Sequence, residues 1–204
     1  MPSATVHLKA AYLMKDQLGI KNETQFYIGA IAPDAVNLDG FATQDERYHA
    51  HIRSKDYDKW KQNINAFYDE KKAAFATSDY LKGYVFHLYT DIAWDELIQP
   101  SLFSFLQKQG CGTDELREQK WQELFRLNGM LSKQDWYAAV KHKLQSALAE
   151  NDISGGQVRQ YLEYIVGDYE REKMLADSPL YLSDNHIFAA AIQATDYAEK
   201  LFGT

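Results

Sequence analysis

The sequence predicts an all-α protein, and three observations support this fold class. Apolar residues recur at steps of three and four along almost the whole chain, the spacing that places them on one face of a helix. Strand-like alternation of apolar and polar residues is sustained nowhere. The 204 residues include four prolines and eleven glycines, which leaves little room for a many-turned β protein. We therefore expect a single-domain helical bundle that spans residues 1–204.

In the first half of the chain, helices alternate with recognisable breaks. Gly19 is expected to end the first helix, and Asn22 with Gln25 resembles a capping box that opens the second. Pro33 ends that second helix, because the residue before a proline avoids the helical region. Residues 35–53 form the least regular stretch. The helices are expected at residues 5–18, 26–32, 56–67 and 80–98.

The second half of the chain predicts four further helices. The clearest carries Trp136, Val140 and Leu144 at four-residue steps, which places them on one face. Gly155 and Gly156 form a turn rather than a phosphate-binding loop, because no GxxxxGK[ST] pattern occurs anywhere in the chain. The helices are expected at residues 121–131, 136–148, 157–174 and 184–201.

Charge and composition exclude several classes of partner. The net charge is −7 and the lysines and arginines are scattered, so no basic stripe is available for a stable nucleic-acid complex. The single cysteine, Cys111, cannot form an internal disulfide, which fits a reducing compartment. The start of the chain shows no signal peptide, and no run of eighteen apolar residues predicts a transmembrane segment. We therefore expect a cytoplasmic protein.

The segment from Gly83 to Trp94 holds the strongest candidate site. His87 and Asp91 lie one helical turn apart on a stripe of mostly large, apolar side chains, so the stripe should face the core. An ionised Asp91 there would cost on the order of several kcal/mol unless it is paired or binds a cation. Gly83 can let a neighbouring backbone approach. The alternative is that Asp91 orients a structural histidine in the core.

Three further segments present histidine or aspartate from apparently inward positions. His7 lies on the apolar face of the first helix, and Asp34 directly follows Pro33 after an apolar segment. His49 and His51 are two residues apart, so on a helix they diverge and one of them points inward. Imidazole and carboxylate ligands together suit zinc, manganese, iron or nickel.

Four pieces of the chain, residues 5–7, 26–34, 45–51 and 83–94, resemble the zinc-dependent phospholipase C family. The likeness is to its small intracellular bacterial branch, and it covers about the first hundred residues. It implies a helical bundle similar to the phospholipase C and P1 nuclease fold, with metal ions clustered at one end. It also implies hydrolysis of phosphate esters.

By position, the resemblance assigns five metal ligands. His7 resembles the early histidine of the family, Asp34 its loop aspartate and His51 its next histidine. His87 and Asp91 resemble the family's HxxxD pair, whose aspartate can bridge two metals.

The chain also departs from the family pattern. Asp95 stands where the family pattern would have a further histidine, so one or two metal ions are expected and a three-metal site is not. A processed N-terminal amine is not expected to serve as a ligand, and phospholipid is the least secure part of the resemblance.

The working hypothesis is hydrolysis of a small phosphoester, a monoester or a diester, by a metal-activated water. Asp34 can ligate the metal or act as the general base. Arg47 and Arg53 follow the same segment as His51, and they can pair with a phosphate or simply lie on the solvated surface.

Three other functions compete with this hypothesis. An HD-type phosphohydrolase requires a His-Asp dipeptide, which the sequence lacks. A ferritin-like di-iron bundle requires two Glu-x-x-His motifs, and only Glu46 with His49 supplies one. The third is a non-catalytic helical binding or scaffold protein with a degenerate metal site, which would bind metal without turnover.

Overall fold

The computed structural model describes residues 1–38, 40, 42–153 and 155–203, and every regular element within these ranges is helical. The predicted all-α class is therefore confirmed for the described residues. None of their helices is both long and apolar enough to cross a membrane. In chain order the elements are α1 (Ala4–Met14), α2 (Glu23–Ile31), the 3₁₀ helix η1 (Ala32–Asn37), α3 (Gln44–Ala50), α4 (Tyr57–Glu70), α5 (Lys72–Phe75), α6 (Asp79–Ala93), the π-helix η2 (Trp94–Ile98), α7 (Gln99–Lys108), α8 (Leu116–Leu131), α9 (Asp135–Glu150), α10 (Gly156–Val166), α11 (Tyr169–Lys173) and α12 (Asp184–Phe202).

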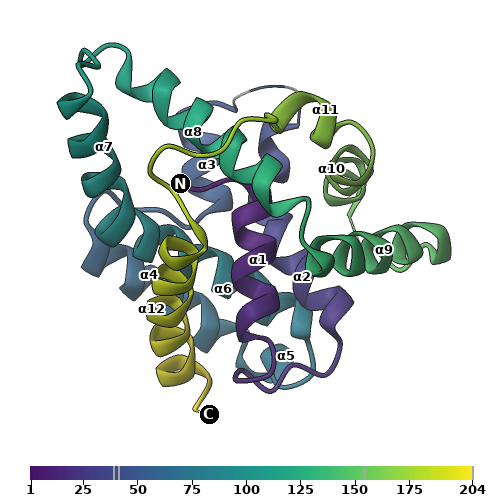
Figure 1. Ribbon diagram of the computed structural model, residues 1–204. Coiled ribbons are helices and arrows are strands. Elements are labelled where there is room, and N and C mark those ends of the chain that lie inside the picture. Colours follow the sequence, from purple (N-terminus) through teal and green to yellow (C-terminus); the bar gives the residue numbers. More distant parts are fainter. Residues whose placement is uncertain (39, 41, 154, 204) are drawn as a thin grey trace.

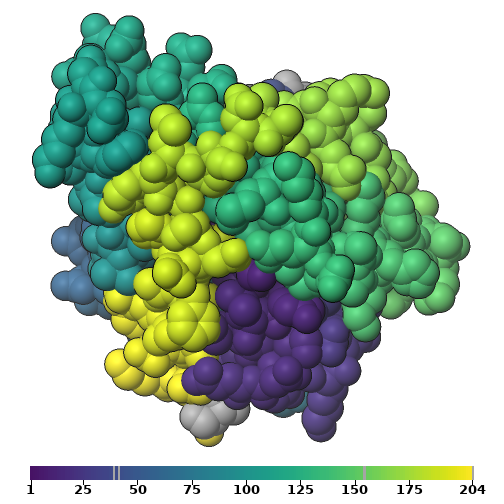
Figure 2. All heavy atoms as spheres, viewed as in Figure 1, coloured from purple at the N-terminus to yellow at the C-terminus, as the bar shows by residue number. Residues whose placement is uncertain are grey.

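Three central helices, α1, α2 and α6, are buried on nearly all sides. Residues 4–11, 26–31 and 85–93 are buried without interruption, as expected of helices enclosed by others. In Figure 1, α1 lies in the middle of the molecule with α12 beside it, and α1 also packs against α2, α8 and α9. Figure 2 shows α12 and the segment before it, in yellow, between the α7–α8 corner and α1.

Two glycines allow α2 and α6 to cross with their backbones in contact. A Cβ atom on Gly29 would lie 2.1 Å from the Tyr80 carbonyl oxygen, and one on Gly83 would lie 2.2 Å from the Phe26 carbonyl oxygen. The prediction that Gly83 lets a neighbouring backbone approach is therefore confirmed. The crossing brings the carbonyl groups of α2 within reach of side chains on α6.

A short helix, α3, occupies the stretch expected to be irregular. The Thr43 side chain accepts a hydrogen bond from the Glu46 amide, and the Glu46 side chain accepts one from the Thr43 amide. This capping box satisfies backbone donors at the start of α3, so seven residues become helical. The expected cap at Asn22 is present, since its side chain accepts from the Gln25 amide.

Several expected helices differ in length from those observed. α1 ends at Met14 rather than Leu18, and Gly19 closes the following turn with a φ of +61°. The expected helix at 157–174 is two helices, α10 and α11, which separate at Gly167. The helices expected at 121–131, 136–148 and 184–201 lie within α8, α9 and α12, and the one expected at 56–67 matches α4 except that Asp56 is its N-cap.

The expected helix at 80–98 changes its winding near its end. α6 ends at Ala93 and continues as the π-helix η2, in which the Gln99 amide donates to the Trp94 carbonyl. α7 follows without a break, with a proline among its first two residues, where the missing amide hydrogen removes one backbone hydrogen bond from the continuous helix. Asp95 lies in this wider turn, directly after the segment that carries Asp91.

Candidate metal centre

Four segments bring all five predicted ligands together in the interior. α1 supplies His7, η1 supplies Asp34, the end of α3 supplies His51, and α6 supplies His87 and Asp91. The three histidines and Asp91 are at most 1% exposed, and Asp34 is 8% exposed. We call these five residues the ligand cluster.

The spacing of the side-chain atoms in the ligand cluster fits a shared cation. Asp91 Oδ1 lies 3.4 Å from His7 Nε2, and Asp91 Oδ2 lies 3.7 Å from both His51 Nε2 and His87 Nε2. Asp34 Oδ1 is 3.4 Å from His51 Nε2. These separations are too long for good hydrogen bonds. Ligand atoms around a tetrahedral zinc ion, each about 2.1 Å from it, lie about 3.4 Å from one another.

The ligand cluster also contains buried polar atoms that nothing in the described part of the chain satisfies. They are both ring nitrogens of His7, the Nε2 atoms of His51 and His87, and both carboxylate oxygens of Asp91. Each such atom costs about 1–3 kcal/mol when it is buried without a partner. A cation bound among them would satisfy several at once, so the residues present fit a metal.

Backbone carbonyl groups orient two of the histidines. His51 Nδ1 lies 2.9 Å from the Arg47 carbonyl oxygen, and His87 Nδ1 lies 2.7 Å from the Ala30 carbonyl oxygen. Because a carbonyl only accepts, each Nδ1 carries the hydrogen and each Nε2 keeps a lone pair directed at the ligand cluster. The His87 ring also stacks on His7, with centroids 3.7 Å apart.

The pKa shifts favour the protonation states that metal ligation requires at two positions. Burial lowers the pKa of His87 to about 3, and His7 adds to the effect, so its imidazole is neutral. Burial opposes ionisation of Asp91, but His87, His7 and His51 outweigh it and lower the pKa. His51 differs: burial lowers its pKa, but Asp34 and Asp91 outweigh burial and raise it.

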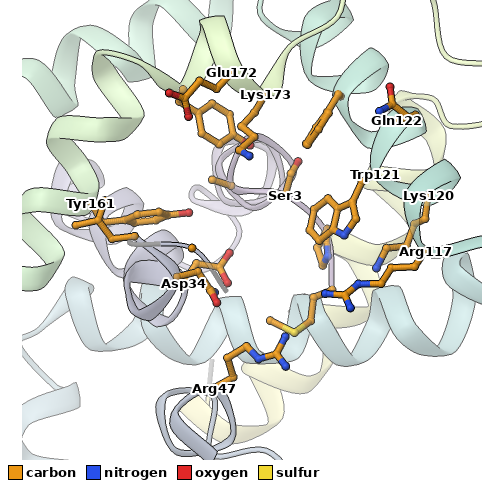
Figure 3. A pocket seen from close by; sticks show the side chains of 18 of the residues that line it. Ser3, Asp34, Arg47, Arg117, Lys120, Trp121, Gln122, Tyr161, Glu172 and Lys173 are labelled. Atoms are coloured by element: carbon orange, nitrogen blue, oxygen red, sulfur yellow. The ribbon is translucent and has the colours of Figure 1, made fainter. Parts of the chain in front are cut away.

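A cavity of about 760 Å³ reaches the ligand cluster at Asp34, a size typical of small-molecule sites. Of the five clustered residues, only Asp34 lines the cavity, and the other four are buried. Figure 3 shows Asp34 and Tyr161 pointing into the same space. Asp34 therefore connects the buried ligands with the space that a substrate could occupy.

Asp95 and Arg53 form a separate pair beside the ligand cluster. Arg53 donates to Asp95 Oδ2 at 2.7 Å, and the Met1 amine donates to Asp95 Oδ1 at 2.9 Å. Both oxygens of this buried carboxylate are thus satisfied. Because Arg53 is held by Asp95, Arg47 is the better placed of the two arginines predicted to meet a phosphate, and both line the cavity.

The two histidines of residues 45–51 differ in burial. His51 is fully buried and joins the ligand cluster, whereas His49 is exposed. Glu46, the other member of the Glu-x-x-His pattern, is exposed and caps α3 with Thr43. The di-iron interpretation therefore has no inward pair at this motif. His142 is exposed as well.

Sequence analysis did not identify the second wall of the cavity. Arg117, Lys120 and Trp121 on α8 line it, opposite Tyr161 of α10. Burial lowers the pKa of Lys120, although Asp95 opposes this effect. The spacing of Arg117 and Lys120 places them on one helix face, but nothing local in the sequence connects α8 with the first hundred residues.

Comparison of the chain with protein-family models, with curated proteins and with solved structures found no match.

Proposed function

We propose that the protein is a metal-dependent hydrolase that acts on a small phosphoester, either a monoester or a diester. The ligand cluster would hold one or two divalent cations, with zinc the best match and manganese, iron or nickel as alternatives. The observation that carries the proposal is the convergence of three unpartnered imidazole Nε2 atoms on both oxygens of a buried aspartate. A bound cation would lower the pKa of an attached water and polarise a phosphoryl oxygen.

Asp91 supports a site for two ions as well as a site for one. Its Oδ1 atom faces His7, and its Oδ2 atom faces His51 and His87. Two groups of ligand atoms lie close enough together to hold an ion: His7, Asp34 and His87 form one, and His51, His87 and Asp91 form the other. Because Asp91 Oδ1 also lies 3.4 Å from His7 Nε2, its carboxylate reaches both groups, which suits a bridging role.

Asp34 is placed to act on the attacking water. Burial opposes its ionisation, but a contact with His51 and the field of His87 outweigh burial and lower its pKa. Its carboxylate faces the cavity, so Asp34 can orient or deprotonate a water molecule beside a phosphoester. Arg47, which also lines the cavity, can pair with the phosphate.

The resemblance of residues 5–7, 26–34, 45–51 and 83–94 to the zinc-dependent phospholipase C family supports the same reaction class. The all-helical architecture is compatible with the phospholipase C and P1 nuclease fold that the resemblance implies. Phospholipid itself is not part of the proposal, which extends to phosphoesters that fit a cavity of about 760 Å³.

Elemental analysis followed by a phosphoester screen tests the proposal. Protein purified without added metal should contain stoichiometric zinc, manganese, iron or nickel, and His87→Ala and Asp91→Ala should lose it. His49→Ala is the matched control, because this exposed histidine should leave the metal content unchanged. A protein that takes up no metal on titration contradicts the proposal. Metal without hydrolysis of any phosphomonoester or phosphodiester favours the non-catalytic binding protein instead.

A further inference from the structure

Three tyrosines line the side of the cavity that faces α8. Tyr161 and Tyr164 come from α10, and Tyr169 comes from α11. The centre of the Tyr164 ring lies 6.2 Å from that of Tyr161 and 5.8 Å from that of Tyr169, so the three rings form one surface, which we call the tyrosine wall. α10 packs against η1, the helix that carries Asp34. The tyrosine wall therefore adjoins the part of the cavity that reaches the ligand cluster.

The hydroxyl groups of the tyrosine wall differ in their partners. The Tyr164 hydroxyl donates to Glu172 Oε2 at 3.0 Å, and the Tyr169 hydroxyl accepts a hydrogen bond from Asn128 Nδ2 at 3.2 Å. The Tyr161 hydroxyl makes no hydrogen bond with any of the residues that the structure describes. Two of the three hydroxyls thus serve contacts within the fold, and that of Tyr161 does not.

Tyr161 is nevertheless almost fully buried and directed at the site. It is 7% exposed, and its side chain extends into the space that the Asp34 carboxylate also faces (Figure 3). A phenol in this position has lost most of its hydration without gaining a partner in the described protein. Burial raises the pKa of Tyr161 well above its usual value, and the charge of Asp34 adds to the effect. The hydroxyl therefore keeps its proton and remains a hydrogen-bond donor beside Asp34.

A phosphoryl oxygen is the acceptor that fits this donor. Under the proposed function the reacting phosphate lies at Asp34 and the ligand cluster, so its oxygens enter the space that Tyr161 and Asp34 share. A hydrogen bond to a charged oxygen is stronger than one to a neutral oxygen, and a fixed donor gains most where negative charge develops during the reaction. Because the phenol is neutral, it can donate to the phosphate without forming an ion pair with Asp34.

We propose that the Tyr161 hydroxyl donates a hydrogen bond to a phosphoryl oxygen of the substrate, which makes Tyr161 a further catalytic residue beside Asp34. The inference rests on the proposed function, which places the reacting phosphate at the ligand cluster. Tyr161 keeps its proton throughout, so it forms and breaks no covalent bond. The alternative is that Tyr161 only packs in the tyrosine wall while water in the cavity meets its hydroxyl. Removal of the hydroxyl would then leave the affinity for phosphate unchanged.

Binding of inorganic phosphate tests the inference without requiring turnover. Tyr161→Phe removes the hydroxyl and keeps the ring, and titration calorimetry with orthophosphate compares this variant with the wild-type protein, each purified with its metal. We expect Tyr161→Phe to bind orthophosphate about tenfold more weakly or worse, the effect of losing one hydrogen bond to a charged oxygen. Tyr12→Phe is the matched control, because Tyr12 is partly buried and does not line the cavity, so its affinity should equal that of the wild type.

Thermal melts provide a second measurement, which separates a role in binding from a role in the fold. Tyr161→Phe should melt no lower than the wild-type protein, because a buried hydroxyl without a protein partner contributes nothing to folding. Tyr169→Phe should melt at a lower temperature, because it removes a buried acceptor from Asn128. A Tyr161→Phe protein that melts well below the wild type would contradict the inference, since its hydroxyl would then serve the fold.

The outcomes distinguish this inference from the proposed function. Equal affinities of the wild type and Tyr161→Phe for orthophosphate, or no binding by the wild type, overturn the role of Tyr161. If a phosphoester is hydrolysed and Tyr161→Phe leaves kcat/KM unchanged, the hydrolase proposal stands and the role of Tyr161 is overturned. A loss of orthophosphate affinity specific to Tyr161→Phe upholds its hydrogen bond to phosphate even if no phosphoester is turned over, and in that case the hydrolase proposal fails.

Discussion

Asp91 and Asp95 are the same residue type one helical turn apart, both buried, yet their surroundings are opposite. Arg53 and the Met1 amine donate to the two oxygens of Asp95. The two oxygens of Asp91 have no hydrogen-bond partner in the described structure and face three imidazoles. Since a buried carboxylate must be compensated, the protein supplies the cations for Asp95, whereas under the proposed function a bound metal would compensate Asp91.

Removal of metal should change the stability of the protein more than any substitution. If it has no effect, Asp91 does not differ from Asp95 in requiring a bound metal. With free metal about 1,000-fold above its dissociation constant, binding stabilises the folded state by about 4 kcal/mol. For a chain of this size, chelation should then lower Tm by about 8–16 °C. Asp95→Asn should keep this chelator-dependent shift, and Asp91→Ala should lose it. Differential scanning fluorimetry with and without EDTA provides the measurement.

The helix crossing that supports the ligand cluster gives the next largest effect. Gly83→Ala should destabilise the protein by about 3 kcal/mol, because the added methyl group meets the Phe26 carbonyl at 2.2 Å and forces α2 away from α6. The same shift would pull the Ala30 carbonyl from His87 and weaken metal binding. Gly156→Ala is the control, since a Cβ there meets nothing within 4 Å. Urea denaturation of the two variants measures the difference, and equal stabilities would show that the crossing tolerates a side chain.

Substitution of each aspartate by asparagine tests the difference between Asp91 and Asp95 directly. Asp95→Asn should cost about 2 kcal/mol by leaving Arg53 without its charged partner, a value reduced from the fully buried case because Arg53 is 21% exposed. Its metal content should not change. Asp91→Asn should lose the metal, and its metal-free form should be destabilised less than Asp95→Asn. Chemical denaturation and elemental analysis of both proteins would reveal the reverse pattern if the roles were exchanged.

The pH dependence of metal affinity depends on His51. Its pKa is raised above 6.5 because Asp34 and Asp91 outweigh burial, so a proton competes with the metal for this imidazole. Affinity should fall by about tenfold for each pH unit below the raised value. In the metal-free protein, the stability from protonated His51 is fully present below pH 6.5 and is lost as pH rises through the raised pKa.

His87 acts in the opposite direction in the metal-free protein. With its pKa lowered to about 3, it stays neutral while the unfolded chain takes up a proton, so stability falls as pH decreases from 6.5 towards 3. Competition with a chelator between pH 5.5 and 8 measures the metal affinity, and acid denaturation after EDTA treatment measures this stability. A metal affinity independent of pH would show that His51 is not a ligand.

The smallest effect is expected at His49. Its substitution by alanine should change stability by less than about 0.5 kcal/mol, because the side chain is exposed. His51→Ala, two residues away, should remove a ligand and lower the metal affinity. Isothermal titration with zinc compares the metal affinities of the two variants. Similar losses of affinity in both would show that His51 is wrongly assigned to the ligand cluster.

Local sequence signals predicted much of the ligand cluster. Periodicity placed His87 and Asp91 on one inward stripe. Pro33 indicated the end of α2, and the 3₁₀ helix η1 that follows places Asp34 at the cavity. The helix α3 could also have been predicted, since Thr43 and Glu46 form a capping-box pattern that is visible in the sequence.

Other features depend on contacts between distant segments, which local patterns do not encode. The pair of Arg53 and Asp95 joins residues 42 positions apart. The placement of Lys120 beside the ligand cluster requires α8 to pack against the first half of the chain. The π-helix at Trp94–Ile98 interrupts a periodicity that would continue smoothly in a regular α-helix, so the sequence predicted one long helix there.

The position of Asp34 has a consequence for how an ion enters and leaves. Of the five ligand candidates, it alone lines the cavity, and the other four are buried. An ion that enters the ligand cluster from this cavity passes Asp34 on its way. A molecule held in the cavity would then cover that route, so it should slow both the uptake and the loss of metal.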